Sequence, residues 1–116
     1  NGLRNMKFYK NLYLSDRYKK KKEELIRKMK EGRYPLSAYV LVLIPDGENQ
    51  LEFYQTSLLY QGYLRTDDLF VVGMAESYMD AMYLIEDITK EVYTKTGTAD
   101  IRSFIKVQDM EITENK

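Results

Sequence analysis

The chain contains neither cysteine nor histidine among its 116 residues. This excludes Ser-His-Asp and Cys-His catalysis, thiolate zinc sites, and metals or haem held by histidine. Carboxylate acid–base chemistry and an all-oxygen Mg²⁺ or Ca²⁺ site stay open. We therefore assign no catalytic residue, expect no cofactor and no metal, and expect a cytoplasmic location, because a cysteine-free chain suits a reducing compartment.

Tryptophan is absent, and the chain has only two prolines and six glycines. With 44% hydrophobic residues, this composition predicts a single folded domain over residues 1–116. The longest apolar run, residues 38–44, is far shorter than the roughly 18 residues that a membrane helix needs, so no membrane association is expected. Met6 is a candidate native start, which would leave residues 1–5 as a disordered extension.

The two halves of the chain carry opposite charge, although the net charge is zero. Residues 1–45 hold 12 Lys/Arg against 4 Asp/Glu, whereas residues 46–116 hold 6 against 14. Such an asymmetry bears on partners. The basic half is a candidate to meet nucleic acid, the acidic half of its own chain, or a second copy of the protein.

Alternating and continuous apolar segments predict the strands. Residues 6–14 alternate, with Met6, Phe8, Leu12 and Leu14 on one face and Lys7, Tyr9, Asn11 and Tyr13 on the other. Residues 38–44 and 69–74 are apolar on both faces, which is typical of central strands covered on both sides. A turn at residues 45–49 leads into a hairpin partner near residues 51–56. Residues 105–112 predict a weaker last strand or an extended tail.

Capping residues and a 3.6-residue period predict two helices. The first helix begins at Ser15 or Asp16 and ends at Gly32, with a thin inward stripe. The second begins after Ser77, which pairs with Asp80 as a capping box, and ends at Gly97. Its expected core stripe consists of Tyr78, Ala81, Met82, Ile85, Ile88 and Val92.

These elements predict an α+β two-layer sandwich: a mixed or antiparallel sheet of four to five strands with two helices on one face. The element order is β-α-β-β-β-α, with a possible last strand. If the first two strands are parallel, the right-handed crossover rule places both helices on the same face. The other face then needs a cover, and we expect a homodimer through that open sheet face.

The first helix carries a run of four lysines at residues 19–22 and is a candidate nucleic-acid surface. Four consecutive helical residues fan around most of the helix, so they form no single patch. Acidic residues interrupt the basic surface at i,i+4 spacing, which is typical of a solvated face. Nucleic-acid binding is therefore possible but not favoured. The second helix has an acidic stripe that consists of Glu76, Asp80, Asp87 and Glu91. The basic first helix and the acidic second helix would complement each other if they lay side by side.

The loop of residues 57–68 holds the best candidate ligand-binding cluster. An arginine there can grip a carboxylate or phosphate, paired aspartates can hold a hard cation, and tyrosines can stack on a ring. These residue types are also common in ordinary loops. The candidate residues are Tyr60, Tyr63, Arg65, Asp67 and Asp68.

The chain has 11 tyrosines, a residue that offers a large contact area and is enriched at interfaces. Four of them lie on predicted strands and are interface candidates, the alternative being amphipathic positions at the edge of the core. These four are Tyr9, Tyr13, Tyr39 and Tyr54. Gly73, between a strand and a helix, is interpreted as a close-packing or bulge residue.

The second half of the chain contains a series of short motifs: FVVGMA at residues 70–75, then Tyr78, Ala81, EVY at residues 91–93, TG at residues 96–97 and Asp100. In these motifs the chain resembles a family of short uncharacterised proteins from gut-type Firmicutes bacteria. The resemblance covers most of the chain and implies a free-standing cytoplasmic protein. It supplies no site residues.

We therefore expect a non-enzymatic interaction or ligand-binding domain. One alternative is a small enzyme acting on an acidic or phosphorylated metabolite through Tyr63, Arg65, Asp67 and Asp68. A second alternative is a nucleic-acid accessory protein that uses the first helix.

Overall fold

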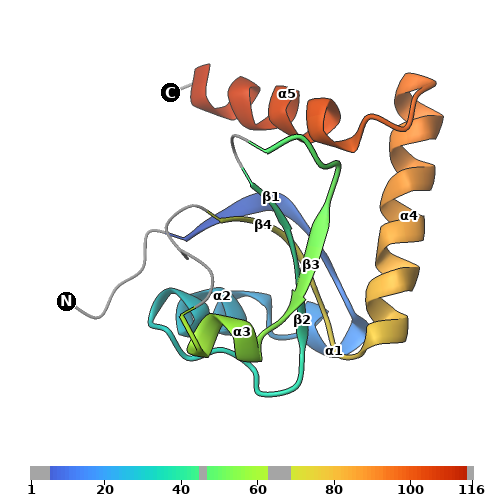
Figure 1. The fold of residues 1–116 in the computed structure, drawn as a ribbon. Helices are drawn as coiled ribbons and strands as arrows, with labels where there is room; N and C mark the ends of the chain where they lie inside the picture. The colour runs from blue at the N-terminus through green and yellow to red at the C-terminus, as the bar shows by residue number, and fades with distance from the viewer. Residues whose placement is uncertain (1–5, 45–46, 63–68, 115–116) are drawn as a thin grey trace.

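The computed structural model describes residues 6–44, 47–62 and 69–114, the last six of these for their backbone alone. Over these residues the chain forms one four-stranded sheet and five helices (Figure 1). In chain order the elements are β1 (Lys7–Leu14), α1 (Asp16–Lys19), α2 (Lys22–Lys30), β2 (Tyr39–Leu43), β3 (Glu52–Gln55), α3 (Ser57–Tyr60), β4 (Phe70–Ala75), α4 (Tyr78–Thr96) and α5 (Ile101–Glu114).

The sheet is mixed, with the strand order β1-β4-β2-β3. β1 runs parallel to β4, whereas β2 runs antiparallel to both β4 and β3. The predicted α+β class with a mixed sheet of about four strands is confirmed. The two segments predicted as doubly covered strands form β2 and β4, which are the central strands of the sheet.

Side chains along each strand alternate between two hydrophobic clusters, one on each face of the sheet. In β2, Val40 packs in the cluster that contains α2, and Leu41 packs in the cluster that contains α4 and α5. The alternation predicted for the first strand is confirmed in the same way. Met6, Phe8, Leu12 and Leu14 lie in the α2 cluster, whereas Tyr9 and Tyr13 lie in the α4 cluster.

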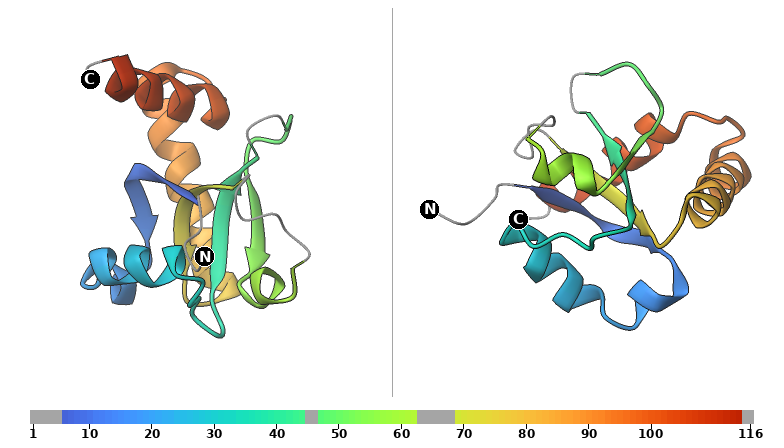
Figure 2. Two further views of the ribbon diagram at one scale, coloured as in Figure 1. Left: turned by 90° about the vertical axis from the view of Figure 1, so that its left-hand side faces the viewer. Right: turned by 60° about the horizontal axis from the view of Figure 1, so that its bottom comes forward.

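The helices divide between the two faces of the sheet, so the expectation of two helices on one face is wrong. Met29 of α2 packs in one cluster, and Ile88 of α4 and Ile105 of α5 pack in the other. The ribbon shows α2 and α4 on opposite sides of the sheet (Figure 2). The expectation depended on the first two strands being parallel. β1 instead pairs with β4, and α1 and α2 lead to a strand of opposite direction, to which the crossover rule does not apply.

Each face of the sheet is therefore covered by helices of the same chain. α2 and α3 supply buried side chains to one cluster, and α4 and α5 supply them to the other. The uncovered face on which the predicted homodimer depended is not found in the described part of the chain. Self-association stays a prediction, but it requires a different surface.

The predicted first helix is divided into α1 and α2 within its lysine run. α1 ends at Lys19, and Lys21 precedes α2 with φ −127° and ψ 30°. Residues 19–24 are all charged, so no apolar side chain between Tyr18 and Leu25 holds this stretch on the sheet. The predicted end of the helix is confirmed: Gly32 has φ 80°, and the N–H of Arg33 donates to the carbonyl of Lys28 (2.8 Å).

The predicted bounds of α4 are confirmed. The Ser77 hydroxyl accepts a hydrogen bond from the N–H of Asp80 (3.1 Å), and Gly97 ends the helix with φ 79°. Of the predicted core stripe, Ala81, Ile88 and Val92 are fully buried. Tyr78 is wrongly placed in that stripe, because half of its surface is exposed.

The segment predicted as a last strand or tail is the helix α5. Asp100 begins it: its carboxylate accepts from the N–H of Ser103 (3.1 Å) and from the Ser103 hydroxyl (2.8 Å). The N–H bond, followed in importance by the hydroxyl bond, lowers the pKa of Asp100. Ile101 and Ile105 are both buried and are spaced i,i+4, which is helical spacing. The strand prediction followed Ile105 and Val107, of which Val107 is exposed.

Candidate functional site

The carboxyl ends of β1 and β4 lie side by side, because the two strands are parallel neighbours. α1 then leads to one face of the sheet and α4 to the other, and a groove of about 310 Å³ lies between them. Ser15 joins the two strand ends. Its N–H donates to the carbonyl of Met74 (3.1 Å), and its Oγ accepts from the N–H of Glu76 (3.1 Å). Sheets with parallel strands often bind ligands at such a place.

Charged side chains of both signs line this groove. Arg17 Nε lies 3.8 Å from Glu76 Oε1, and Lys19 Nζ lies 3.6 Å from Asp16 Oδ1. Asp80 and Asp87 lie on its α4 side. Across the residues that the structure describes, no group of three or more Asp and Glu side chains is arranged to hold a metal ion. The groove is thus a solvated, charged surface to which the geometry assigns no ligand.

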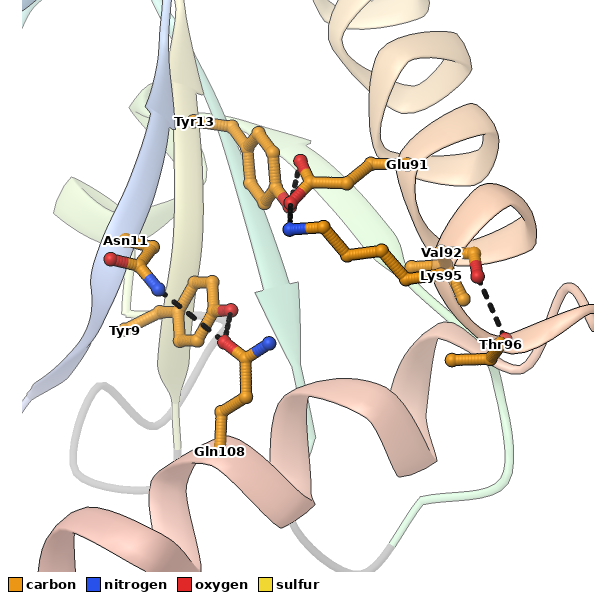
Figure 3. Close-up of polar contacts among 8 residues, drawn as sticks. All are labelled: Tyr9, Asn11, Tyr13, Glu91, Val92, Lys95, Thr96 and Gln108. Carbon is orange, nitrogen blue, oxygen red and sulfur yellow. Dashed lines mark hydrogen bonds and ion pairs between the residues drawn. The ribbon is translucent and has the colours of Figure 1, made fainter.

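Two of the predicted interface tyrosines, Tyr9 and Tyr13, instead bind the helices that cover their own sheet (Figure 3). The Tyr13 hydroxyl donates to Glu91 Oε1 (2.9 Å), and Glu91 Oε2 accepts from Lys95 Nζ (2.8 Å). Burial, followed by the bond to Glu91, raises the pKa of Tyr13. The bond from Lys95 lowers the pKa of Glu91 and raises that of Lys95. This chain of contacts fixes α4 against β1.

A second set of contacts fixes α5 against the same strand. The hydroxyl of Tyr9 donates to Oε1 of Gln108, which also accepts from Nδ2 of Asn11 (3.3 Å). Tyr9 is almost fully buried and stacks on Tyr13, with 6.2 Å between ring centroids. Burial is the main reason that the pKa of Tyr9 is raised. Both tyrosines therefore have a structural role in holding α4 and α5.

The other two interface candidates lie on opposite faces of the sheet. Tyr39 packs in the α4 cluster, where its ring contacts Phe53 and Tyr78 at centroid distances of 6.2 and 6.1 Å. Tyr54 packs in the α2 cluster, and its hydroxyl donates to the Glu52 carboxylate. That bond, with burial second, raises the pKa of Tyr54 to about 12. The four tyrosines do not form one platform.

Of the predicted ligand-binding cluster, only Tyr60 falls within the described residues. It ends the short helix α3, in a segment predicted as a loop. Its hydroxyl donates to the carbonyl of Tyr34 (2.6 Å), and the two rings meet edge to face at 5.1 Å. This packing accounts for Tyr60 without a ligand. The remaining candidates lie outside the described residues: Tyr63, Arg65, Asp67 and Asp68.

The basic and acidic helices do not lie side by side as expected, because α2 and α4 cover opposite faces of the sheet. The pair of Arg17 and Glu76 links the two charged regions at the strand ends. On α2, Lys28 Nζ lies 3.1 Å from Glu24 Oε1, in agreement with the predicted i,i+4 pairing. The basic surface is thus interrupted by internal ion pairs.

The outward face of α4 carries a row of exposed residues that the sequence analysis left unassigned. We call it the α4 outer surface: Met79, Tyr83, Glu86, Lys90 and Tyr93. At about 100° per residue, these positions fall within about 40° of one line along the helix. Met79, Tyr83 and Tyr93 are 55%, 58% and 63% exposed. The i, i+4, i+7, i+11, i+14 spacing is visible in the sequence, but it competes there with the stronger core stripe.

No family model, no curated protein and no solved structure matches this chain. The resemblance to a bacterial family therefore stays an expectation. None of the helices in the described part of the chain combines the length and the apolar character required to cross a bilayer. A function for this protein has to follow from its own surfaces.

Proposed function

We propose that this protein is a non-enzymatic interaction domain that docks on a protein partner through the α4 outer surface. The supporting observation is a concentration of exposed apolar side chains on one helix. Among the described residues, seven large hydrophobic side chains are strongly exposed, and three of them belong to the α4 outer surface: Met79, Tyr83 and Tyr93. A fourth, Tyr78, lies on another side of α4, against Tyr39 and Phe53. Exposed apolar side chains that gather on one face of a helix commonly mark a docking site.

The chemistry of the surface suits a protein interface. Tyrosine and methionine are enriched at interfaces, and tyrosine adds contact area at a low cost in conformational entropy. Glu86 and Lys90 lie between the apolar residues, with 3.2 Å between Lys90 Nζ and Glu86 Oε1. The opposite side of α4 is anchored by buried Ile88 and Val92, so its outer side chains stand on a fixed backbone.

The enzyme alternative has no comparable support. It depends on Tyr63, Arg65, Asp67 and Asp68, which lie outside the described residues. The nucleic-acid alternative depends on a basic helix whose charges are partly paired with acids, as at Glu24 and Lys28. A cytoplasmic location belongs to the proposal, because a chain without cysteine suits a reducing compartment.

Position-specific photo-cross-linking in the living cells that express the protein tests this function. A benzophenone amino acid replaces Tyr83 on the α4 outer surface. The matched control replaces Leu36, which is 82% exposed, lies between α2 and β2 in the chain and is close to Leu25 and Lys28 of α2. We expect a discrete adduct at position 83 and none at position 36. Adding Tyr93→Ser should remove most of the adduct, because it deletes a neighbouring contact.

Equal adducts at both positions, or no adduct at position 83, would contradict the proposal. Circular dichroism of each purified variant confirms that the fold is retained. Since Tyr83, Tyr93 and Leu36 are all exposed, their replacement leaves both hydrophobic clusters intact.

A further inference from the structure

We propose that the partner of the α4 outer surface is a second copy of this chain, with the two α4 helices antiparallel. This inference rests on the proposed function and specifies its partner. The observation that carries it is the symmetry of the row: Tyr83, Glu86, Lys90 and Tyr93 are separated by three, four and three residues. These four residues therefore read tyrosine, charge, charge, tyrosine from either end, and Met79 lies outside this symmetric set.

An antiparallel pair in this register brings Tyr83 of one copy against Tyr93 of the other. The same register brings Glu86 of each copy against Lys90 of its partner, so both charge contacts are attractive. This is an isologous interface, in which one surface is complementary to itself about a twofold axis. A parallel pair in register would place Glu86 against Glu86 and Lys90 against Lys90, which is repulsive.

The two charges are available for such a contact. The Glu86 and Lys90 side chains are 62% and 72% exposed, and the pair that they form within the helix is only a weak surface ion pair. An acidic or a basic partner would match only one of them, whereas a second copy matches both. The outer side of α4 faces away from the sheet in Figure 1, so two copies can approach along it.

The contact is short, which sets the affinity expected of it. Tyr83 and Tyr93 are separated by about 15 Å along the helix axis. One helix pair of this length gives an interface at the small end of the known range, so the dimer should be weak. We expect a purified sample to change from monomer to dimer between about 1 µM and about 1 mM in sedimentation equilibrium.

Charge reversal tests both the partner and the register. Glu86→Lys and Lys90→Glu each create two repulsive contacts in the symmetric dimer and should weaken it about tenfold. An equimolar mixture of these two variants should dimerise again. In the mixed dimer, the lysine introduced at position 86 faces the glutamate introduced at position 90, and the native Lys90 faces the native Glu86. Neither variant keeps the ion pair within α4, so restored pairing can only arise between chains.

The matched control reverses an ion pair of the same spacing on another helix. Glu24→Lys and Lys28→Glu disrupt the 3.1 Å pair on α2 and should leave the monomer–dimer equilibrium unchanged. A wild-type chain that stays monomeric up to about 1 mM, or a variant mixture that stays monomeric, overturns the inference. If position 83 still forms its adduct in cells with a different protein, the docking surface survives and only the second copy is rejected. Loss of both results rejects both proposals.

Discussion

At the scale of single residues, Gly73 decides how closely β1 and β4 can approach. A Cβ atom at this position would lie 2.6 Å from the carbonyl oxygen of Tyr13, which is backbone and has little freedom to move. The interpretation of Gly73 as a close-packing residue is therefore confirmed. The pairing of β4 with both of its neighbours also shifts register close to this glycine.

Gly73→Ala should destabilise the fold by about 1–3 kcal/mol, because the added methyl forces the two strands apart. Urea unfolding followed by circular dichroism measures the change. Gly97 gives a contrast: it has no atom within 4 Å of its added Cβ but has φ +79°. Gly97→Asn should be tolerated better than Gly97→Ala, because asparagine adopts the left-handed region more readily. A Gly73→Ala protein as stable as wild type would show that the close contact imposes no constraint.

Residue-scale predictions from sequence succeed where one side chain carries a local physical reason. Ser77 begins a helix because its hydroxyl accepts a backbone N–H, and Gly32 and Gly97 end helices because glycine adopts positive φ. Tyr78 was misplaced because its angular position borders the apolar stripe. Its ring meets Phe53 and Tyr39 at the margin of the sheet instead of entering the core.

At the scale of elements, α5 is held by both apolar and polar contacts, among them hydrogen bonds from the Arg102 guanidinium to the carbonyls of Ile44 (2.8 Å) and Asn49 (2.9 Å). Ile101 and Ile105 pack in the α4 cluster, and Gln108 binds Tyr9 further along the helix. The sequence of α5 is compatible with a strand and with a helix, because its apolar residues occur both at i,i+2 spacing, as in a strand, and at i,i+4 spacing, as in a helix. The buried i,i+4 pair and the Asp100 cap favour the helix, and the exposed Val107 removes the alternation.

Gln108→Ala should loosen α5 without unfolding the domain. The variant loses the part-buried bond from Tyr9 and the exposed bond from Asn11. Loss of the part-buried bond corresponds to about 0.5–1.5 kcal/mol, so amide exchange in α5 should rise about threefold to tenfold. Hydrogen–deuterium exchange with mass spectrometry resolves α5 from α4, whose exchange should not change. Val107→Ala is the matched control, because it alters an exposed neighbour on the same helix. Equal exchange in both variants would mean that Gln108 does not hold the helix.

At the scale of the whole molecule, the face of the sheet on which each helix lies depends on which strands pair. These strands are distant in sequence, so local sequence patterns do not predict their pairing. The apolar faces of residues 38–44 and 69–74 correctly indicated that both sides of the sheet are covered. Local patterns do not specify that β1 pairs with β4, and this pairing places α2 and α4 on opposite faces. The helices of the chain itself therefore cover the sheet face that was expected to pair with a second copy. The basic helix α2 and the acidic helix α4 lie on opposite faces of the sheet.

The same arrangement exposes the α4 outer surface. When α4 is fixed over β4 and β2, its far side is presented to solvent. The spacing of Met79, Tyr83 and Tyr93 could be seen in the sequence, but the side of the helix that stays uncovered could not. Residue type alone indicated a ligand site in the segment of residues 57–68, and the one candidate residue there that the structure describes, Tyr60, packs on Tyr34.

The stability of the whole fold should decline in alkali because tyrosines that are buried or hydrogen-bonded to a carboxylate resist ionisation. The pKa values of Tyr9 and Tyr13 are raised above the ordinary 10.0, and that of Tyr54 is raised to about 12. Above pH 10 the unfolded chain therefore loses protons that the folded chain retains. Fewer protons on the unfolded state mean that the free energy of unfolding falls as pH rises. The contribution is fully present below pH 10, and for Tyr54 it is lost between pH 10 and about 12.

Tyr13→Phe separates this effect from general alkaline damage. At neutral pH the variant should be about 1 kcal/mol less stable than wild type, because the hydrogen bond to Glu91 is lost. Above pH 10 the stability difference between the two proteins should narrow, because phenylalanine has no proton to release and the wild type alone is destabilised at this position.

Urea unfolding of both proteins at a series of pH values measures the difference directly. Tyr78→Phe, at an exposed tyrosine outside the α4 outer surface, is the control and should follow the wild-type curve. A stability difference between wild type and Tyr13→Phe that stays constant through this alkaline range would show that the Tyr13 hydroxyl does not couple ionisation to folding.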